Sequence, residues 1–118
     1  MPSDQVKEKA DAFGFVGEAF YACANNSLLD QRRERLVYYA NAAECFVQGN
    51  RLKEAADCFK RVGQYGKAAR AYREGGYFDE MAEVLERHGD QIEAGLLTQL
   101  TKAMAMFFER TGRNQVYA

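Results

Sequence analysis

Few residues of this chain have the types and spacing that catalytic chemistry requires. The candidate nucleophiles and metal ligands are Cys23, Cys45, Cys58 and His88, since the sequence holds three cysteines and one histidine. Without a Cys-x-x-Cys pair or a second histidine, the pattern predicts neither a zinc site nor a disulfide framework. Phosphate-loop, His-Glu-x-x-His and Gly-x-Ser-x-Gly motifs are also missing from the sequence. We therefore expect no catalytic residues, no metal, no cofactor and no enzymatic activity in this segment.

These four residues have simpler structural interpretations. His88 precedes Gly89 at the expected end of a short helix, where a partly charged imidazole would interact favourably with the helix dipole. Cys45 and Cys58 occupy an apolar position of a repeated pattern and should be buried and inert, because apolar surroundings raise the pKa of a thiol. Cys23 lies outside that pattern, so a reactive thiol stays open for it alone.

The elements that carry these residues follow from a block of thirteen residues that is written four times between residues 43 and 94. The blocks begin at Ala43, Ala56, Ala69 and Ala82. Their eighth positions hold Asn50, Gly63, Gly76 and Gly89. An apolar stripe followed by glycine or asparagine is typical of a short helix and its C-terminal stop. Helices this short do not persist alone in water, so we expect them to stack.

The repeated block resembles a known helical repeat. Segments 49–59, 63–72 and 76–82 look like the Gly-x-Tyr-x-x-Ala core of tetratricopeptide (TPR) repeats. Two blocks make a hairpin of 26 residues, against about 34 in the standard repeat, so the resemblance implies a shortened, TPR-like fold.

A narrower resemblance is carried by segments 42–49 and 69–81, Ala-Ala-Glu-Cys-Phe-Val-Gln-Gly and Ala-Arg-Ala-Tyr-Arg-Glu-Gly-Gly-Tyr-Phe-Asp-Glu-Met. They are similar to the TPR-like region of fungal UvrD/Rep-type helicase-like proteins, and the similarity extends over residues 10–110. It implies an appendage of such a protein, with the helicase-like ATPase motor encoded elsewhere.

Composition narrows the class of protein. Sixteen basic and seventeen acidic residues give a net charge of −1, which argues against broad attraction to nucleic acid or to an anionic membrane. The N-terminus is too charged for a signal peptide, and no apolar run approaches the roughly eighteen residues that span a bilayer. We expect a soluble intracellular protein, cytoplasmic or nuclear, without a membrane partner.

We expect an all-α fold in which residues 1–118 form a single TPR-like domain, an α-solenoid of about six helices in three antiparallel hairpins. The only proline is Pro2, so nothing after it forbids helix. The short helices are predicted at about 52–62, 65–74 and 78–87, and the longer flanking helices at 4–24, 28–48 and 91–110. Ser3 is the predicted N-cap of the first helix, and Ser27 with Asp30 is a capping box for the second. Gly14 and Gly17 are interpreted as packing contacts inside the first helix.

The last predicted helix has a wide apolar stripe. Its members are Leu96, Leu97, Leu100, Ala103, Met104, Phe107 and Phe108. The block register returns at Ala105 and would begin again at Ala118. The pattern therefore predicts a segment of a longer solenoid, or a last helix that a partner covers, and it leaves self-association through open solenoid ends as a third possibility.

Block positions two, five and six point away from the expected core. From them we predict six partner-binding residues, Asp57, Arg61, Arg70, Arg73, Glu83 and Glu86. The expected function is a non-enzymatic scaffold that binds a protein or peptide. The alternative is an accessory repeat segment of a helicase-like protein that positions nucleic acid or a regulatory partner.

Two further groups of residues have competing interpretations. The basic residues Arg32, Arg33, Arg35, Lys60, Arg61, Arg70 and Arg73 could bind phosphates or acidic peptides. They could equally form a solvated face interleaved with acidic residues, which is the interpretation that we favour. The aromatic residues Tyr65, Tyr77 and Phe78 are expected to wedge between successive hairpins rather than to line a binding groove.

Overall fold

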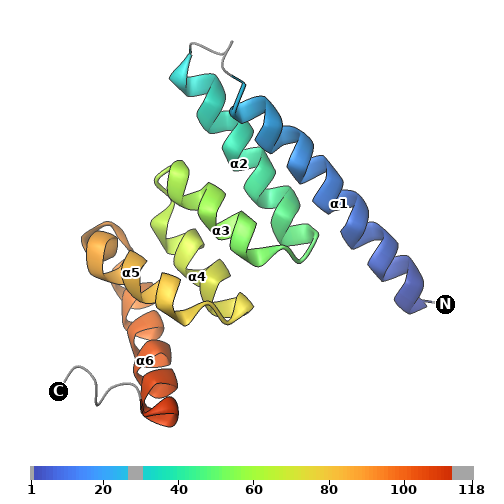
Figure 1. Cartoon of the computed structure of the whole chain (residues 1–118). Helices are drawn as coiled ribbons and strands as arrows, with labels where there is room; N and C mark the ends of the chain where they lie inside the picture. The colour runs from blue at the N-terminus through green and yellow to red at the C-terminus, as the bar shows by residue number, and fades with distance from the viewer. Residues whose placement is uncertain (1, 27–30, 113–118) are drawn as a thin grey trace.

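The fold is all-α, as predicted. The structure, a computed structural model, describes residues 2–26 and 31–112, and none of these residues lies in a β-strand. Its elements are α1 (Pro2–Ala24), α2 (Arg32–Gln48), α3 (Leu52–Arg61), α4 (Tyr65–Gly75), α5 (Phe78–His88), the 3-10 helix η1 (Gly89–Gln91) and α6 (Ala94–Thr111) (Figure 1). No helix among the described residues is both long enough and apolar enough to cross a membrane.

The three short helices begin at the predicted residues and end within one residue of the predicted ends. Asn50, Gly63 and Gly76 have φ angles of 57°, 79° and 81°, in the left-handed region that stops a helix at little cost to glycine. Three of the four eighth-position residues therefore act as the sequence predicts.

Gly89 does not act as predicted, and the start of the last helix at residue 91 is wrong as a result. Gly89 has a φ of −57° and stays right-handed, so the chain continues from α5 into η1. Ile92 is then extended and buried, and α6 begins only at Ala94, after the N-cap residue Glu93.

The N-terminal boundaries also differ from prediction. The first helix begins at Pro2, because proline fits the first turn of a helix, where its missing N–H is not needed. Ser3 consequently lies inside α1 and is not its N-cap. The capping box of Ser27 with Asp30 lies outside the described residues, within which α2 begins at Arg32.

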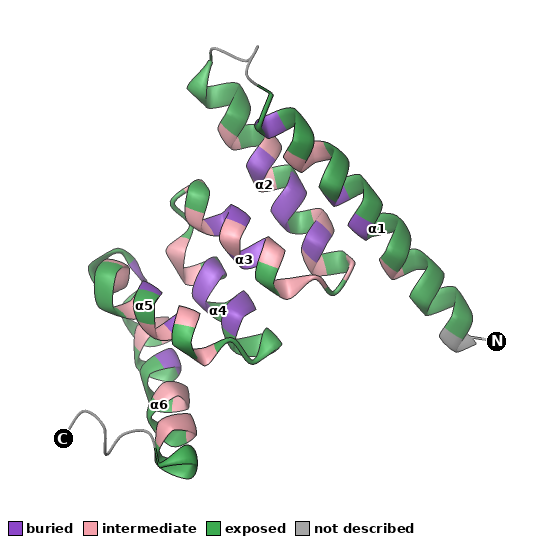
Figure 2. Cartoon of the chain, in the orientation of Figure 1, coloured by how far each residue is buried: buried purple, intermediate pink, exposed green. Residues whose placement is uncertain are grey.

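Each helix packs on the next one along the chain. The pairs α1 with α2, α2 with α3, α3 with α4, α4 with α5 and α5 with α6 all make contact, and α4 also touches α6. Figure 2 shows buried segments concentrated on α2, α3 and α4, while most of α1 is exposed. The centre of the core holds the alanine pairs 42–43, 55–56 and 68–69 beside Phe46, Phe59 and Tyr72, because small side chains let helix backbones approach closely.

Gly14 and Gly17 of α1 are both buried where α1 meets α2, which confirms their interpretation as packing contacts. A Cβ on Gly17 would lie 2.7 Å from Cδ1 of the buried Phe46 ring. A Cβ on Gly49, just after α2, would lie 2.9 Å from the backbone nitrogen of Gly14 and 2.9 Å from the backbone oxygen of Ala10. The two long helices could not lie this close with larger residues at either position.

Candidate partner-binding site

The six predicted partner-binding residues do not converge on one surface. Arg61, at the end of α3, donates a hydrogen bond from Nη1 to Tyr39 Oη at 3.2 Å. Its guanidinium carbon also lies 5.0 Å from the centre of the Tyr39 ring, a distance typical of a cation–π contact. Arg61 is exposed, yet these contacts join α3 to α2.

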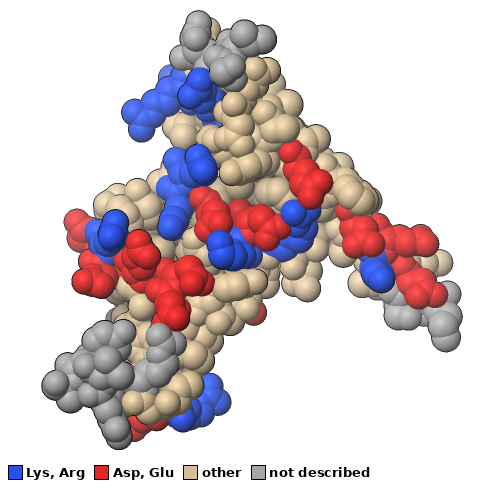
Figure 3. All heavy atoms as spheres, in the orientation of Figure 1, with Lys and Arg blue, Asp and Glu red and all other residues tan. Residues whose placement is uncertain are grey.

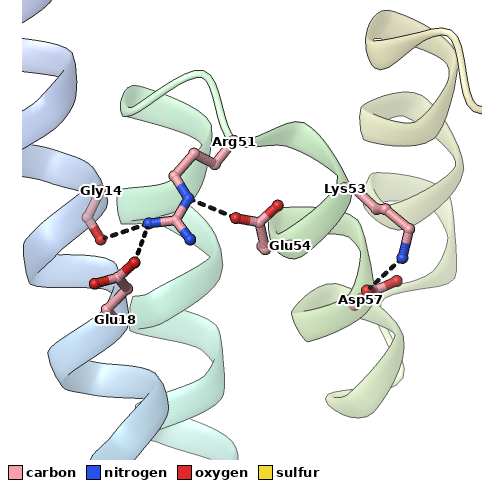
Figure 4. A network of polar contacts seen from close by, with 6 residues as sticks. All are labelled: Gly14, Glu18, Arg51, Lys53, Glu54 and Asp57. Carbon is pink, nitrogen blue, oxygen red and sulfur yellow. Dashed lines mark hydrogen bonds and ion pairs between the residues drawn. The ribbon is translucent and has the colours of Figure 1, made fainter.

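Asp57 lies in the contact between α3 and α4. It accepts a hydrogen bond from the hydroxyl of Tyr72, whose side chain is fully buried. It also pairs with Lys53 at 3.3 Å, as Figure 4 shows. Burial raises the pKa of the Tyr72 phenol, and the hydrogen bond to Asp57 raises it further, so the phenol stays protonated and donates to the carboxylate.

Arg70 and Arg73 project from α4 and are exposed. Arg70 lines a shallow hollow together with Glu44, Lys67 and Glu74, and Lys67 is paired with Glu44 at 3.4 Å. Charges of both signs therefore meet beside Arg70. Around Arg70, this mixture of charges is consistent with the interleaved face that the sequence favours over a continuous basic patch.

Glu83 and Glu86 are the two predicted residues that the structure brings together, at a groove between α5 and α6. We call it the α5–α6 groove, and its volume is about 940 Å³. Its lining residues are Asp79, Ala82, Glu83, Leu85, Glu86, Arg87, Leu97, Thr101, Met104 and Phe108. Apolar side chains come from both helices, whereas the acidic side chains all come from α5. Figure 3 shows acidic side chains gathered where Figure 1 places α5.

A cap at the start of α6 and a ring stack near its end position this helix. The Glu93 carboxylate accepts hydrogen bonds from the backbone N–H groups of Gly95 and Leu96, both at 2.9 Å, and these bonds lower the pKa of Glu93. Farther along α6, the Phe107 ring stacks on Phe78 with centroids 4.2 Å apart. The cap therefore sets where α6 begins after η1, and the ring stack holds the far part of α6 against α5.

The aromatic residues predicted to wedge between hairpins have different environments. Phe78 does so against α6, as described. Tyr65 stacks on His88 with ring centroids 3.7 Å apart and nearly parallel planes, which joins α4 to the end of α5. Tyr77 is 37% exposed and packs edge-on against Tyr72.

Arg51 is an interaction centre that reasoning from the sequence missed. Its guanidinium pairs with Glu18 of α1 and with Glu54 of α3, each at 2.5 Å (Figure 4). The hydrogen bond that Arg51 donates to the Glu18 carboxylate is the main cause of the raised pKa of Arg51. Arg51 lies in the turn between α2 and α3. In the sequence it is marked only as a basic residue that follows the helix-stop residue Asn50. The network ties α1 to α3.

The candidate nucleophiles and metal ligands do not form a reactive site among the described residues. Cys58 is fully buried, and burial raises the pKa of its thiol to about 11. Cys45 is half-buried with its pKa also raised by burial, whereas Cys23 is exposed. In the described ranges, no three His, Cys, Asp or Glu side chains lie close enough together to hold a metal ion.

Comparisons of the chain with protein-family models, with curated proteins and with solved structures give no match. The TPR-like and helicase-related resemblances therefore stay predictions.

Proposed function

We propose that the chain is a non-enzymatic protein-interaction module, a short α-solenoid of TPR-like antiparallel hairpins. The order of helix packing supports the solenoid, because every helix contacts its neighbour in sequence. The left-handed stops at Asn50, Gly63 and Gly76 support the repeat, because they recur at the block period. The ligand that we propose is an amphipathic helix of a partner protein with basic residues beside its apolar face.

The α5–α6 groove is the observation that carries this proposal. Its apolar residues Leu85, Leu97, Met104 and Phe108 are only half-buried, so they retain apolar surface that a ligand can cover. A groove between two helices is a common docking site for the apolar face of a third helix, whose anchor residues recur at i, i+3, i+4 and i+7.

The acidic side of the groove specifies the charge of that ligand. Asp79, Glu83 and Glu86 stand along α5 where it borders the groove, and the one basic residue there, Arg87, pairs with Glu83 at 3.6 Å. Because exposed carboxylates of one sign steer and orient an oppositely charged partner, lysine or arginine should flank the apolar anchors of the ligand.

The proposal is tested by fluorescence anisotropy with a labelled amphipathic helical peptide of leucine and lysine. We expect saturable binding that weakens by about tenfold or more in the double variant Glu83→Lys, Glu86→Lys and that loses most of its salt dependence. Met104→Ser should weaken binding at every salt concentration, because it removes apolar contact. Glu74→Lys makes the same kind of charge change on α4, away from the groove, and should leave binding nearly unchanged.

Equal binding to the parent chain and to the groove variants would contradict the proposal. A labelled single-stranded oligonucleotide in the same assay tests the helicase-related alternative. An affinity for the oligonucleotide that falls linearly with salt on logarithmic axes, and that is lost on changing Arg61, Arg70 and Arg73 to glutamate, would favour that alternative.

A further inference from the structure

Helix α1 has an apolar face that nothing in the described structure covers. Between Ala12 and Ala24, Glu18 is the only charged residue, and it is paired with Arg51. Phe15 is 69% exposed and Val16 is 46% exposed. A helix that is apolar on more than one side is normally covered on each of those sides.

The uncovered face is a continuous stripe, which we call the α1 stripe and define as Ala12, Val16, Ala19 and Cys23. All four residues are exposed. Their spacing of four, three and four residues places them on one side of a helix, as in the seam of a coiled coil. The buried residues of α1, Gly14, Gly17 and Ala24, lie on the other side against α2. Helix α1 thus has two apolar faces, of which α2 covers one (Figure 2).

We propose that the α1 stripe is a dimer interface on which α1 of a second copy packs antiparallel. In one antiparallel register Ala12 faces Cys23 of the other copy while Val16 faces Ala19. In this register each residue of one copy makes the same contact as its equivalent in the other copy, as a two-fold axis requires. Each pair sets a smaller side chain against a larger one, which lets the two helices approach closely.

Charge at the two ends of the stripe selects the second copy, and the antiparallel direction, as the occupant. Beside the N-terminal end of the stripe, α1 carries Asp4, Glu8 and Asp11 against Lys7 and Lys9. Beside the C-terminal end, α2 begins with Arg32, Arg33 and Arg35 against Glu34. Figure 3 shows the basic group at that end and mainly acidic side chains at the start of α1. An antiparallel pair brings opposite ends together, whereas a parallel pair would bring like charges together.

This interface is separate from the α5–α6 groove, so it does not rest on the proposed function. A single helix from each copy covers less than the roughly 800 Å² per partner of a standard interface. We therefore expect a reversible dimer with a dissociation constant of about 10 μM or weaker.

Sedimentation velocity over a wide range of concentration tests the interface. The parent chain should change from monomer to dimer, and Val16→Glu should raise the dissociation constant about tenfold or more, because it buries a carboxylate in the seam. Val37, on α2, is 53% exposed, so Val37→Glu is the matched control and should dimerise like the parent chain. A chain that stays monomeric at every concentration overturns the proposal.

Disulfide trapping tests the register and does not require a destabilising variant. Under mild oxidation Ala12→Cys should form an intermolecular disulfide with Cys23 of the other copy, and adding Cys23→Ser should abolish it. In the parent chain the two Cys23 residues would be about 16 Å apart along the helix axis, beyond the reach of a disulfide.

Two results would contradict the antiparallel stripe specifically. A Cys23 to Cys23 disulfide in the parent chain would indicate a parallel pair. A dimer that persists in Val16→Glu but is lost in the double variant Glu83→Lys, Glu86→Lys would use the α5–α6 groove. That second result would overturn this inference and leave the groove as a protein-binding surface.

Discussion

Polar residues that the repeat pattern places outside the core contact the neighbouring helices. Asp57 accepts a hydrogen bond from the buried Tyr72, and Arg61 lies over the Tyr39 ring. The spacing of a repeat tells which side of a helix a residue occupies, but it does not tell how far a long side chain reaches along the surface. For this reason the sequence predicted the orientation of these residues and not their partners.

Removing either partner of the Tyr72 to Asp57 hydrogen bond should lower stability by different amounts. Tyr72→Phe should cost about 1 kcal/mol, the net contribution of a typical hydrogen bond. Asp57→Ala should cost about 1–3 kcal/mol, because the buried hydroxyl would lose its acceptor. Urea denaturation measures both free energies of unfolding. If Asp57→Ala instead left stability unchanged and weakened peptide binding, Asp57 would be a ligand contact after all.

The Glu93 cap should make the stability of α6 depend on pH. Backbone N–H donors lower the pKa of this carboxylate in the folded chain, so its contribution is fully present above the unfolded pKa of about 4.5 and is lost as pH falls through the lowered value. Glu93→Gln should reduce the Tm at pH 7. The difference in Tm between the variant and the parent chain should shrink below pH 4, and a constant difference would contradict the cap.

Helix ends were largely predictable from the sequence, because glycine or asparagine follows most of the short helices. Asn50, Gly63 and Gly76 all adopt the expected left-handed conformation. Gly89 has the same residue type at the same repeat position but stays right-handed, since Glu93 provides a separate N-cap and Ile92 is buried after the 3-10 turn. The repeat pattern therefore could not show that the chain continues from α5 into a 3-10 turn at Gly89 and that Glu93 caps the next helix.

The contact between α1 and α2 should tolerate an added methyl group at one glycine but not at another. Gly17→Ala should destabilise the fold by about 1–3 kcal/mol, because the new Cβ would meet the buried Phe46 ring at 2.7 Å. Gly14→Ala should cost less than about 1 kcal/mol or stabilise the fold. There the neighbour is Cδ of Arg51 at 3.2 Å, part of a flexible side chain, and alanine favours the helix. Equal thermal unfolding of the two variants would contradict this packing.

At the scale of the whole molecule, the order of helix packing was predictable and the α5–α6 groove was not. Short helices with alanine at their contacts had to pack on their neighbours in sequence, and they do. The α5–α6 groove depends on where α6 starts, and that start was displaced by η1. Glu83 and Glu86 were therefore named correctly as outward-facing residues, while their apolar neighbours Leu97, Met104 and Phe108 were assigned only to the stripe of the last helix.

The most direct test of the proposed function is a titration of the ¹⁵N-labelled chain with the amphipathic leucine and lysine peptide, followed by amide chemical shifts in two-dimensional NMR. We predict saturable shift changes concentrated in α5 and α6 around the groove, with α2 and α3 nearly unchanged. Saturable changes centred on another surface, or no saturable changes at all, would contradict the account.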